Sequence, residues 1–250
     1  MNDLVRYGLA AGAALAAGTA NAIAGGGSLI TFPALMAIGL PAVAANVTNT
    51  VALCPGYVGA VLAQRRDLVG QGRRAARLLP GAAVGGAAGA LILLWSGEAV
   101  FRAIVPYLIL FAAVALALQD RLRGWLVSRS GGGHSEAWAI APVALVAVYG
   151  GYFGAGFGVM LLAATAIVLG DSLIRLNALK QTTSLTVNVP AAVVFALSGQ
   201  VDWPIAGVMF AASLAGGAIG GAIASRIPAA VLKWAIVVAS VIVAIVYLVK

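Results

Sequence analysis

The sequence predicts an all-α integral membrane protein built from two inverted repeats, and three observations lead to that fold class. The chain of 250 residues is 62% hydrophobic and only 9% charged, with a mean hydropathy of +1.05. A soluble domain normally has about a quarter charged residues, because its surface faces water. The apolar residues of this chain form blocks of about twenty, the length that crosses roughly 30 Å of hydrocarbon. Both halves of the chain, finally, contain the same order of apolar segments.

The first half begins with a long apolar run, residues 4–24, which stops at three consecutive glycines. The next apolar run, residues 28–38, is only about half as long as a membrane span. A polar segment, residues 119–136, ends this half, and we expect it to be a loop. Between the short run and the loop, full spans are expected at residues 41–64, 75–95 and 100–118.

The second half repeats this order. Its opening apolar run, residues 137–152, stops at a second glycine-rich break, and the run after it, residues 157–169, is again too short to cross a bilayer. Full spans are expected at residues 173–197, 205–224 and 229–249.

Sequence similarity between the halves supports a repeat. The stretch AGGGSLITFPALMAIGLP (residues 24–41) parallels FGAGFGVMLLAATAIVLGD (residues 153–171), and TNTVALCPG parallels TTSLTVNVPA. Internal repeats are typical of secondary transporters. We therefore divide the chain into a first transmembrane repeat, residues 1–118, a cytoplasmic linker loop, residues 119–136, and a second transmembrane repeat, residues 137–250.

The orientation of the halves depends on what the glycine-rich breaks do. If each break is the tip of a re-entrant hairpin, the three spans that follow invert the second half, and most Lys and Arg residues lie on one face. The positive-inside rule then places both termini outside and the segments 65–77 and 119–136 in the cytoplasm. If each break is a kink inside one continuous span, five cations move to the other face: Arg102, Arg175, Lys180, Arg226 and Lys233. The hairpin gives the sharper charge asymmetry, so it is the prediction.

Several classes of function are disfavoured by composition. The single cysteine, Cys54, excludes an intramolecular disulfide and a multi-thiolate metal site, and the single histidine, His134, lies in a Gly/Ser-rich loop. Acidic residues occur only near the ends of spans, so we expect no metal site, no cofactor and no enzymatic activity. The net charge of +8 is explained by basic cytoplasmic loops rather than by binding to nucleic acid. We expect a multi-pass protein of a bacterial-type inner membrane.

The glycine-rich breaks are the first candidate binding elements. A half-helix that begins inside the bilayer presents free N–H groups and a partial positive charge, which favour an anion. Two such helix N-termini, one from each half, would face the same central site. The alternative is that these glycines only allow helices to cross closely. The candidate substrate-binding residues at the breaks are Gly25, Gly26, Gly27, Ser28, Gly154 and Gly156.

Polar side chains follow each short run, inside the first full span of each half. Asn and Gln carboxamides each carry two donors that suit an oxyanion. Hydrogen bonding between helices is the alternative use of such residues. The candidate substrate-binding residues in the first span are Asn46, Thr48, Asn49 and Thr50, and those in the matching span of the second half are Lys180, Gln181, Thr182, Thr183 and Ser184.

Lys180 has two interpretations. A lysine inside a span is costly, and an anionic substrate is its natural partner. Its long stem could instead reach the interface, because the span begins only two turns earlier, at Leu173.

The sequence also resembles a known family. The stretch AGGGSLITFPALMAIGLPAVAANVTNTVAL (residues 24–53) is similar to the opening signature of the sulfite exporter TauE/SafE family of permeases. NALKQ (residues 177–181) and FALSGQVDW (residues 195–203) resemble the family's second-half motif. The resemblance implies transport of sulfite, sulfonates or related sulfur oxyanions, by export or, in the toluene-sulfonate permease branch, by uptake.

The sequence therefore predicts a secondary transporter that moves a small sulfur-containing anion by alternating access. Its expected partners are the anionic substrate, the lipid bilayer and a coupling ion, H⁺ or Na⁺, and the oligomeric state stays open. A non-transporting membrane scaffold or assembly protein is the alternative from another class, and a transporter of a different small anion is the alternative within the same class.

Overall fold

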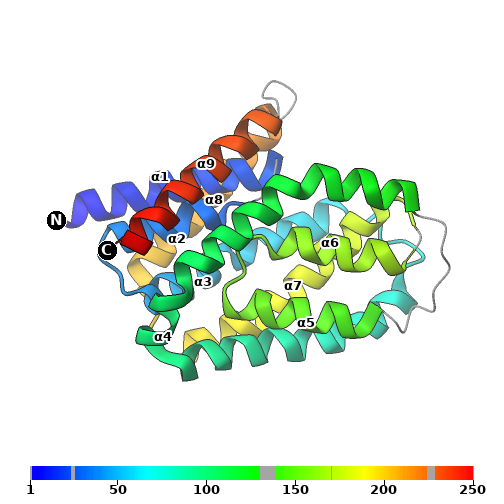
Figure 1. Ribbon diagram of the computed structural model, residues 1–250, viewed down its shortest axis with the longest axis horizontal. Coiled ribbons are helices and arrows are strands. Elements are labelled where there is room, and N and C mark those ends of the chain that lie inside the picture. The colour runs from blue at the N-terminus through cyan, green and yellow to red at the C-terminus, as the bar shows by residue number, and fades with distance from the viewer. Residues whose placement is uncertain (1, 24–25, 130–138, 170, 224–228, 250) are drawn as a thin grey trace.

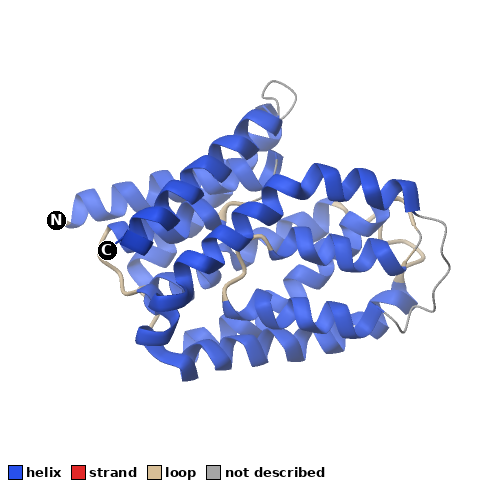
Figure 2. Cartoon of the chain, in the orientation of Figure 1, coloured by secondary structure: helices blue, strands red, loops and turns tan. Residues whose placement is uncertain are grey.

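The computed structural model describes residues 2–23, 26–129, 139–169, 171–223 and 229–249. Within these ranges the regular secondary structure is entirely α-helical apart from a short 3₁₀ segment, as Figure 2 shows. The predicted all-α fold class is confirmed. The candidate residue Gly25, the histidine His134 and residues 130–136 of the expected loop lie outside the described residues.

The helices follow the predicted order in both halves (Figure 1). Each half begins with one helix, a glycine-rich break and a short helix, as the apolar runs predict. The first half contains α1 (Asp3–Ile23), α2 (Ser28–Ala37), α3 (Ala42–Ala63) and α4 (Gly72–Arg129). The second half contains α5 (Ile140–Tyr152), α6 (Phe157–Val168), α7 (Leu173–Leu197), α8 (Trp203–Ile223) and α9 (Ala229–Val249).

Helix α4 consists of two arms that meet at Gly97. This glycine has φ 71° and ψ 178°, which lies outside the helical region, and the chain reverses there, as Figure 1 shows below the α4 label. The two arms, residues 72–96 and 98–129, correspond to the two spans expected at 75–95 and 100–118. Gly72–Leu122 and Ala230–Val249 are long and apolar enough to cross a membrane.

The prediction of a loop at residues 119–136 is wrong for residues 119–129, because α4 continues as a helix to Arg129. Asp120 and Arg121 are exposed on this extension. A fall in hydropathy marks the end of an apolar run, but Gln, Arg and Leu all favour helix, so the helix persists after the apolar run has ended. The division of the chain into two repeats around this segment stays a prediction.

Each opening helix packs mainly against a helix of the other half: α1 lies along α8, and α5 lies along α4. Glycines allow both contacts to be close. A Cβ atom on Gly216 would lie 2.1 Å from the Leu15 carbonyl oxygen, and a Cβ on Gly151 would lie 2.1 Å from the Gly86 oxygen. For these glycines, close helix crossing is the role that the structure supports.

Helices α3 and α7 run antiparallel to each other. At one end, Asn177 Nδ2 donates to Gln64 Oε1 at 2.8 Å, and at the other, Asp202 N–H donates to Thr48 Oγ1 at 3.0 Å. Antiparallel placement of these corresponding helices is what inverted repeats require. The two chain termini also lie at the same end of the molecule (Figure 1). The repeat itself stays a prediction.

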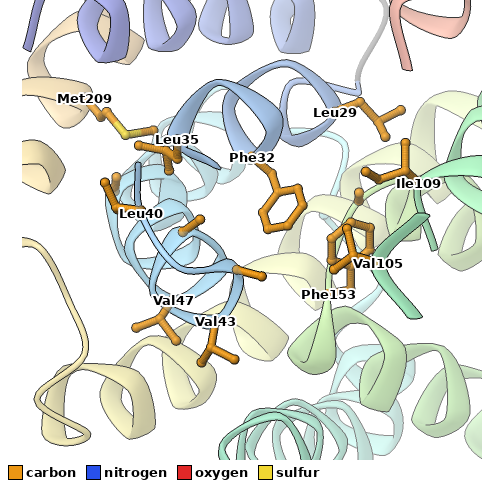
Figure 3. Close-up of a cluster of buried hydrophobic side chains, with 14 of the residues drawn as sticks. Leu29, Phe32, Leu35, Leu40, Val43, Val47, Val105, Ile109, Phe153 and Met209 are labelled. Carbon is orange, nitrogen blue, oxygen red and sulfur yellow. The ribbon is translucent and has the colours of Figure 1, made fainter. Parts of the chain in front are cut away.

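A hydrophobic cluster fills the space between α2 and the second break (Figure 3). The ring of Phe32 on α2 meets the ring of Phe153 edge-on, with centroids 5.2 Å apart, and Phe101 packs against both rings. Edge-to-face packing of this kind adds to the stabilisation from apolar burial. The cluster therefore joins the short helix of the first half to the glycine-rich break of the second.

Candidate functional site

The two glycine-rich breaks pack against neighbouring turns of one helix, the second arm of α4. Gly26 has φ +84°, and a Cβ on it would lie 2.9 Å from Leu116 Cδ2. Gly156 has φ +74°, and its Cβ would lie 3.2 Å from the Cα of Ala112. Ala112 and Leu116 are one helical turn apart. The structure thus brings the two breaks close together, and both require a conformation that glycine adopts without strain.

Neither half-helix has a side-chain cap among the described residues. Helix α2 follows Gly27, and α6 follows Gly156. Some donors are already used: the Gly27 N–H donates to Asn21 Oδ1 at 2.8 Å, and the Gly154 N–H donates to the Tyr149 carbonyl at 3.2 Å. In the first turns themselves, the Leu29 N–H donates to the Gly26 carbonyl at 2.9 Å and the Phe157 N–H donates to the Gly154 carbonyl at 3.3 Å. Ser28, the first residue of α2, is half-buried. An uncapped helix N-terminus keeps its partial positive charge available to an anion.

Asn49 is oriented by a hydroxyl from α2. Thr31 Oγ1 donates to Asn49 Oδ1 at 2.5 Å, and both side chains are buried. This contact uses the amide oxygen and leaves the NH₂ group as the donor end of the carboxamide. The same hydroxyl also lies 3.2 Å from the Gly27 carbonyl oxygen at the first break. Thr31 was not among the predicted site residues. Its position in the first helical turn after the first break could have marked it as a candidate.

Asn46, one turn earlier on α3, is oriented by the other half of the chain. Its Nδ2 donates at 2.9 Å to the carbonyl of Tyr152, the last residue of α5. The residue is 1% exposed, and its Oδ1 has no hydrogen-bond partner among the described residues. Asn46 therefore ties α3 to the second break through its donor and leaves an acceptor unpaired.

Three of the hydroxyl candidates, Thr48, Thr182 and Thr183, have partners within the protein. Thr48 accepts the backbone N–H of Asp202, as described above, and anchors the connection between α7 and α8. On α7, Thr182 donates to the Ala178 carbonyl at 3.1 Å, and Thr183 donates to the Leu179 carbonyl at 2.9 Å. Thr50 and Ser184 are buried, and within the described ranges neither hydroxyl has a hydrogen bond to a break. For the paired hydroxyls, internal hydrogen bonding is the observed use.

Lys180 and Gln181 lie toward the opposite end of α3 from Asn49. Asn177, one turn before Lys180, contacts Gln64 at the C-terminal end of α3. At 1.5 Å per residue, Lys180 is then roughly 20 Å from Asn49 along the helix axis. The side chains of Lys180 and Gln181 are half-buried. The structure therefore does not bring Lys180 and Gln181 together with the two asparagines of α3.

A polar cluster that the sequence did not predict joins the halves at this end; we call it the Asp171 clasp, formed by Val69, Gln71, Arg74, Asp171 and Arg175. The Asp171 carboxylate accepts from Arg74 Nη1 at 2.5 Å and from Arg175 Nε at 3.2 Å. Arg175 Nη1 donates to the Val69 carbonyl at 3.0 Å, and Gln71 Nε2 donates to the Arg175 carbonyl at 3.0 Å. The two connections before α4 and α7 are thereby linked.

The pKa of Asp171 reflects this clasp. Burial by itself would raise the pKa, but the Ser172 backbone N–H, Arg74 and Arg175 donate to the carboxylate and hold its pKa below the ordinary value. Sequence reading missed the clasp because Arg74 and Asp171 are far apart in the chain.

Broken helices, apolar spans and buried carboxamides together define a helical membrane protein of the transporter class. A match to the family Sulfite exporter TauE/SafE extends over residues 10–247, and the chain belongs to this family. The predicted family resemblance is confirmed. No solved structure gives a significant match to the chain.

Curated relatives are named as membrane transporters. A probable membrane transporter protein of Haemophilus influenzae is 30% identical over 200 residues, covering 80% of this chain and 78% of the relative. The probable membrane transporter protein YfcA of Escherichia coli K12 is 29% identical over 208 residues, covering 83% and 76%. The probable membrane transporter protein ORF9 of a Sinorhizobium species is 28% identical over 234 residues, covering 93% and 88%. Membrane localisation and a transport role follow for the family as a whole.

Proposed function

We propose that this protein is a secondary transporter of a small sulfur oxyanion or organosulfonate, working by alternating access of two inverted repeats. The family match supports the sulfur chemistry, and the names of the relatives support transport. The observation that carries the proposal is the meeting of the two uncapped breaks on neighbouring turns of α4.

The anion would lie between these breaks and the NH₂ group of Asn49. Helix N-termini and carboxamide donors together surround an oxyanion with N–H groups, without requiring a fixed cation. None of the hydrogen bonds or ion pairs of the described residues joins a carboxylate to Asn49 or to either break. An anion there would meet no like charge in direct contact.

Alternating access would move the halves around this site. The antiparallel α3 and α7 contact each other across the two halves, and the Asp171 clasp lies at one end of that pair. Rocking of one repeat against the other requires such contacts to break and re-form on each cycle.

A ligand panel on purified protein tests the proposal. Sulfite, sulfate, thiosulfate and sulfonates are each added to the protein in detergent, with chloride at equal ionic strength as the control. A ligand that binds the folded state raises the melting temperature in proportion to its occupancy. Stabilisation by a sulfur oxyanion or sulfonate is expected.

Stabilisation only by a carboxylate or phosphate would assign a different small anion. The absence of stabilisation by any anion, together with no flux of the panel anions into proteoliposomes, would favour the scaffold alternative.

A further inference from the structure

We propose that Asn46 Oδ1 and the C-terminal end of α5 form a binding site for a monovalent coupling cation, Na⁺. The inference deepens the proposed anion transport and rests on it for its role. The cation would bind beside the anion on α3, one helical turn from Asn49.

The first observation is the polarity of the Asn46 side chain. Its NH₂ group faces the Tyr152 carbonyl at 2.9 Å. Rotation of the amide by half a turn would set two oxygens face to face at that distance, so the orientation is determined by the contact. Sequence reasoning assigned Asn46 to the anion as a donor. The structure instead uses the donor internally, in the contact with Tyr152, and leaves the acceptor oxygen without a partner among the described residues.

The second observation is that this acceptor is buried and unpaired. Asn46 is 1% exposed, and Oδ1 has no hydrogen-bond partner among the described residues. Buried polar atoms are nearly always paired, because an unpaired one loses its hydration without compensation. A cation or a hydrogen-bond donor satisfies a carbonyl-type oxygen, whereas an anion is repelled by it.

The third observation is the electrostatic setting. The oxygen belongs to a carboxamide that touches the last residue of α5, and a helix C-terminus carries a partial negative charge with free carbonyl groups. Asn46 Oδ1 therefore lies beside a helix end whose partial negative charge favours a cation. Half-helix C-termini and unwound carbonyls are the elements from which transporters build Na⁺ sites.

A carboxylate contributes charge to this region from a distance. Glu98 accepts the backbone N–H groups of Ala42 at 2.7 Å and Val43 at 2.8 Å, at the start of α3 and one turn from Asn46. Its negative charge favours a cation near Asn46 without coordinating it. Because the near ligands are uncharged oxygens, a monovalent ion suits the site better than a divalent one, whose extra charge would stay uncompensated.

A proton is a poorer occupant than Na⁺. The near groups are a carboxamide and a peptide carbonyl, and neither holds a proton near neutral pH. The neighbouring turn of α3 would hold the anion at Asn49, so the two opposite charges would attract across a short, water-poor distance. Each ion should then raise the affinity of the other by the same factor.

The test measures sulfite binding to the purified protein by calorimetry in NaCl and in choline chloride at equal ionic strength. Na⁺ should raise the sulfite affinity by about fivefold or more, the usual lower range of coupling between two sites. NaCl without sulfite should also raise the melting temperature above that in choline chloride. Equal melting temperatures and equal sulfite affinities in the two salts would overturn the cation site.

Variants assign the effect to Asn46. Asn46→Leu should abolish both Na⁺ effects, and Asn46→Ser, which keeps a smaller oxygen, should retain part of them. The matched control is Asn188→Ala, because Asn188 is another buried carboxamide of the spans, and its side chain has partners within the protein: Nδ2 donates to the Ser184 carbonyl, and the side chain also hydrogen-bonds Tyr57. Full Na⁺ effects in Asn46→Leu would overturn the assignment. If Asn46→Leu does not fold, Asn46→Ser tests the assignment, and full Na⁺ effects in Asn46→Ser would overturn it.

The outcomes separate the two proposals. Sulfite binding that is indifferent to Na⁺ removes the cation site and leaves the proposed function intact. Na⁺ stabilisation without binding of any panel anion supports the cation site and contradicts the proposed substrate class.

Discussion

At the scale of single residues, two asparagines one turn apart on α3 acquire opposite polarity from their neighbours. Thr31 occupies the oxygen of Asn49, whereas the Tyr152 carbonyl occupies the nitrogen of Asn46. The same residue type therefore presents donors at one position and an acceptor at the next. Composition cannot distinguish these roles, because each is decided by a partner that comes from a different part of the chain.

Replacing Asn49 with Ala should weaken binding of the preferred anion by roughly three- to tenfold, since a neutral hydrogen bond contributes about 1 kcal/mol. Lys180→Gln should weaken it less, because Lys180 lies roughly 20 Å from Asn49 along the helix axis. Calorimetric titration of both variants measures the difference. A larger loss in Lys180→Gln, at equal expression, would restore the prediction that this lysine contacts the substrate.

At the scale of elements, glycines serve two distinct purposes. Gly86, Gly151 and Gly216 allow helices to cross at backbone contact. Gly26 and Gly156 have positive φ and lie in the breaks from which the half-helices start. The sequence shows the same residue, Gly, in both cases. The two roles are distinguished only by the backbone angles and by the atoms that approach the glycine.

Gly156→Val should destabilise the second break and abolish transport. A β-branched residue at φ +74° is strained by about 1–3 kcal/mol, and its Cβ would press on the backbone of Ala112. The control is Gly158→Ala, because Gly158 lies inside α6 and a Cβ there meets nothing within 4 Å. Thermal unfolding and flux into proteoliposomes should show a loss for the first variant and near wild-type values for the second. Unimpaired transport by Gly156→Val would remove this glycine from the site.

The Asp171 clasp makes a pH-dependent contribution to the stability of the folded protein. Because the folded-state pKa of Asp171 is lower than its ordinary value of 3.8, the contribution is present above pH 3.8 and is lost as the pH falls through the folded-state pKa. Asp171→Asn should lower the melting temperature at pH 7 and flatten its decline in acid. Melting curves from pH 7 to pH 3 for the wild type and the variant measure this. Parallel declines in both proteins would show that the clasp contributes nothing at this site.

At the scale of the whole molecule, both termini lie at one end (Figure 1), and the connections at residues 64–71 and 198–202 lie at opposite ends of the α3–α7 pair. The basic residues Arg65 and Arg66 belong to the first connection. The positive-inside rule predicts that this connection lies in the cytoplasm and the termini outside.

Cysteine labelling tests this orientation in a Cys54→Ser background. Arg65 and Gln200 are both exposed and lie at opposite ends of the molecule. An impermeant thiol reagent should label Gln200→Cys in intact cells, and should label Arg65→Cys only after permeabilisation. The reverse pattern would invert the predicted topology.

Hydropathy and glycine spacing were sufficient to establish the helical membrane class, the order of long and short helices, and the two breaks, because these are local properties of the chain. They were insufficient at residues 119–129, where the apolar run ends but the helix continues. The sequence correctly predicted that helices are interrupted at Gly26 and Gly156. It did not predict that both breaks contact one arm of α4, because that contact depends on helix packing.

The orientation of Asn46, the distance of Lys180 from Asn49, and the Asp171 clasp were decided by tertiary structure alone. In each case the deciding partner lies far away in the chain: Tyr152 for Asn46, Gln64 for the helix that carries Lys180, and Arg74 for Asp171. The type of a side chain tells which hydrogen bonds it can make, but burial and packing determine which of its atoms make them. The atoms left over are those available to a ligand.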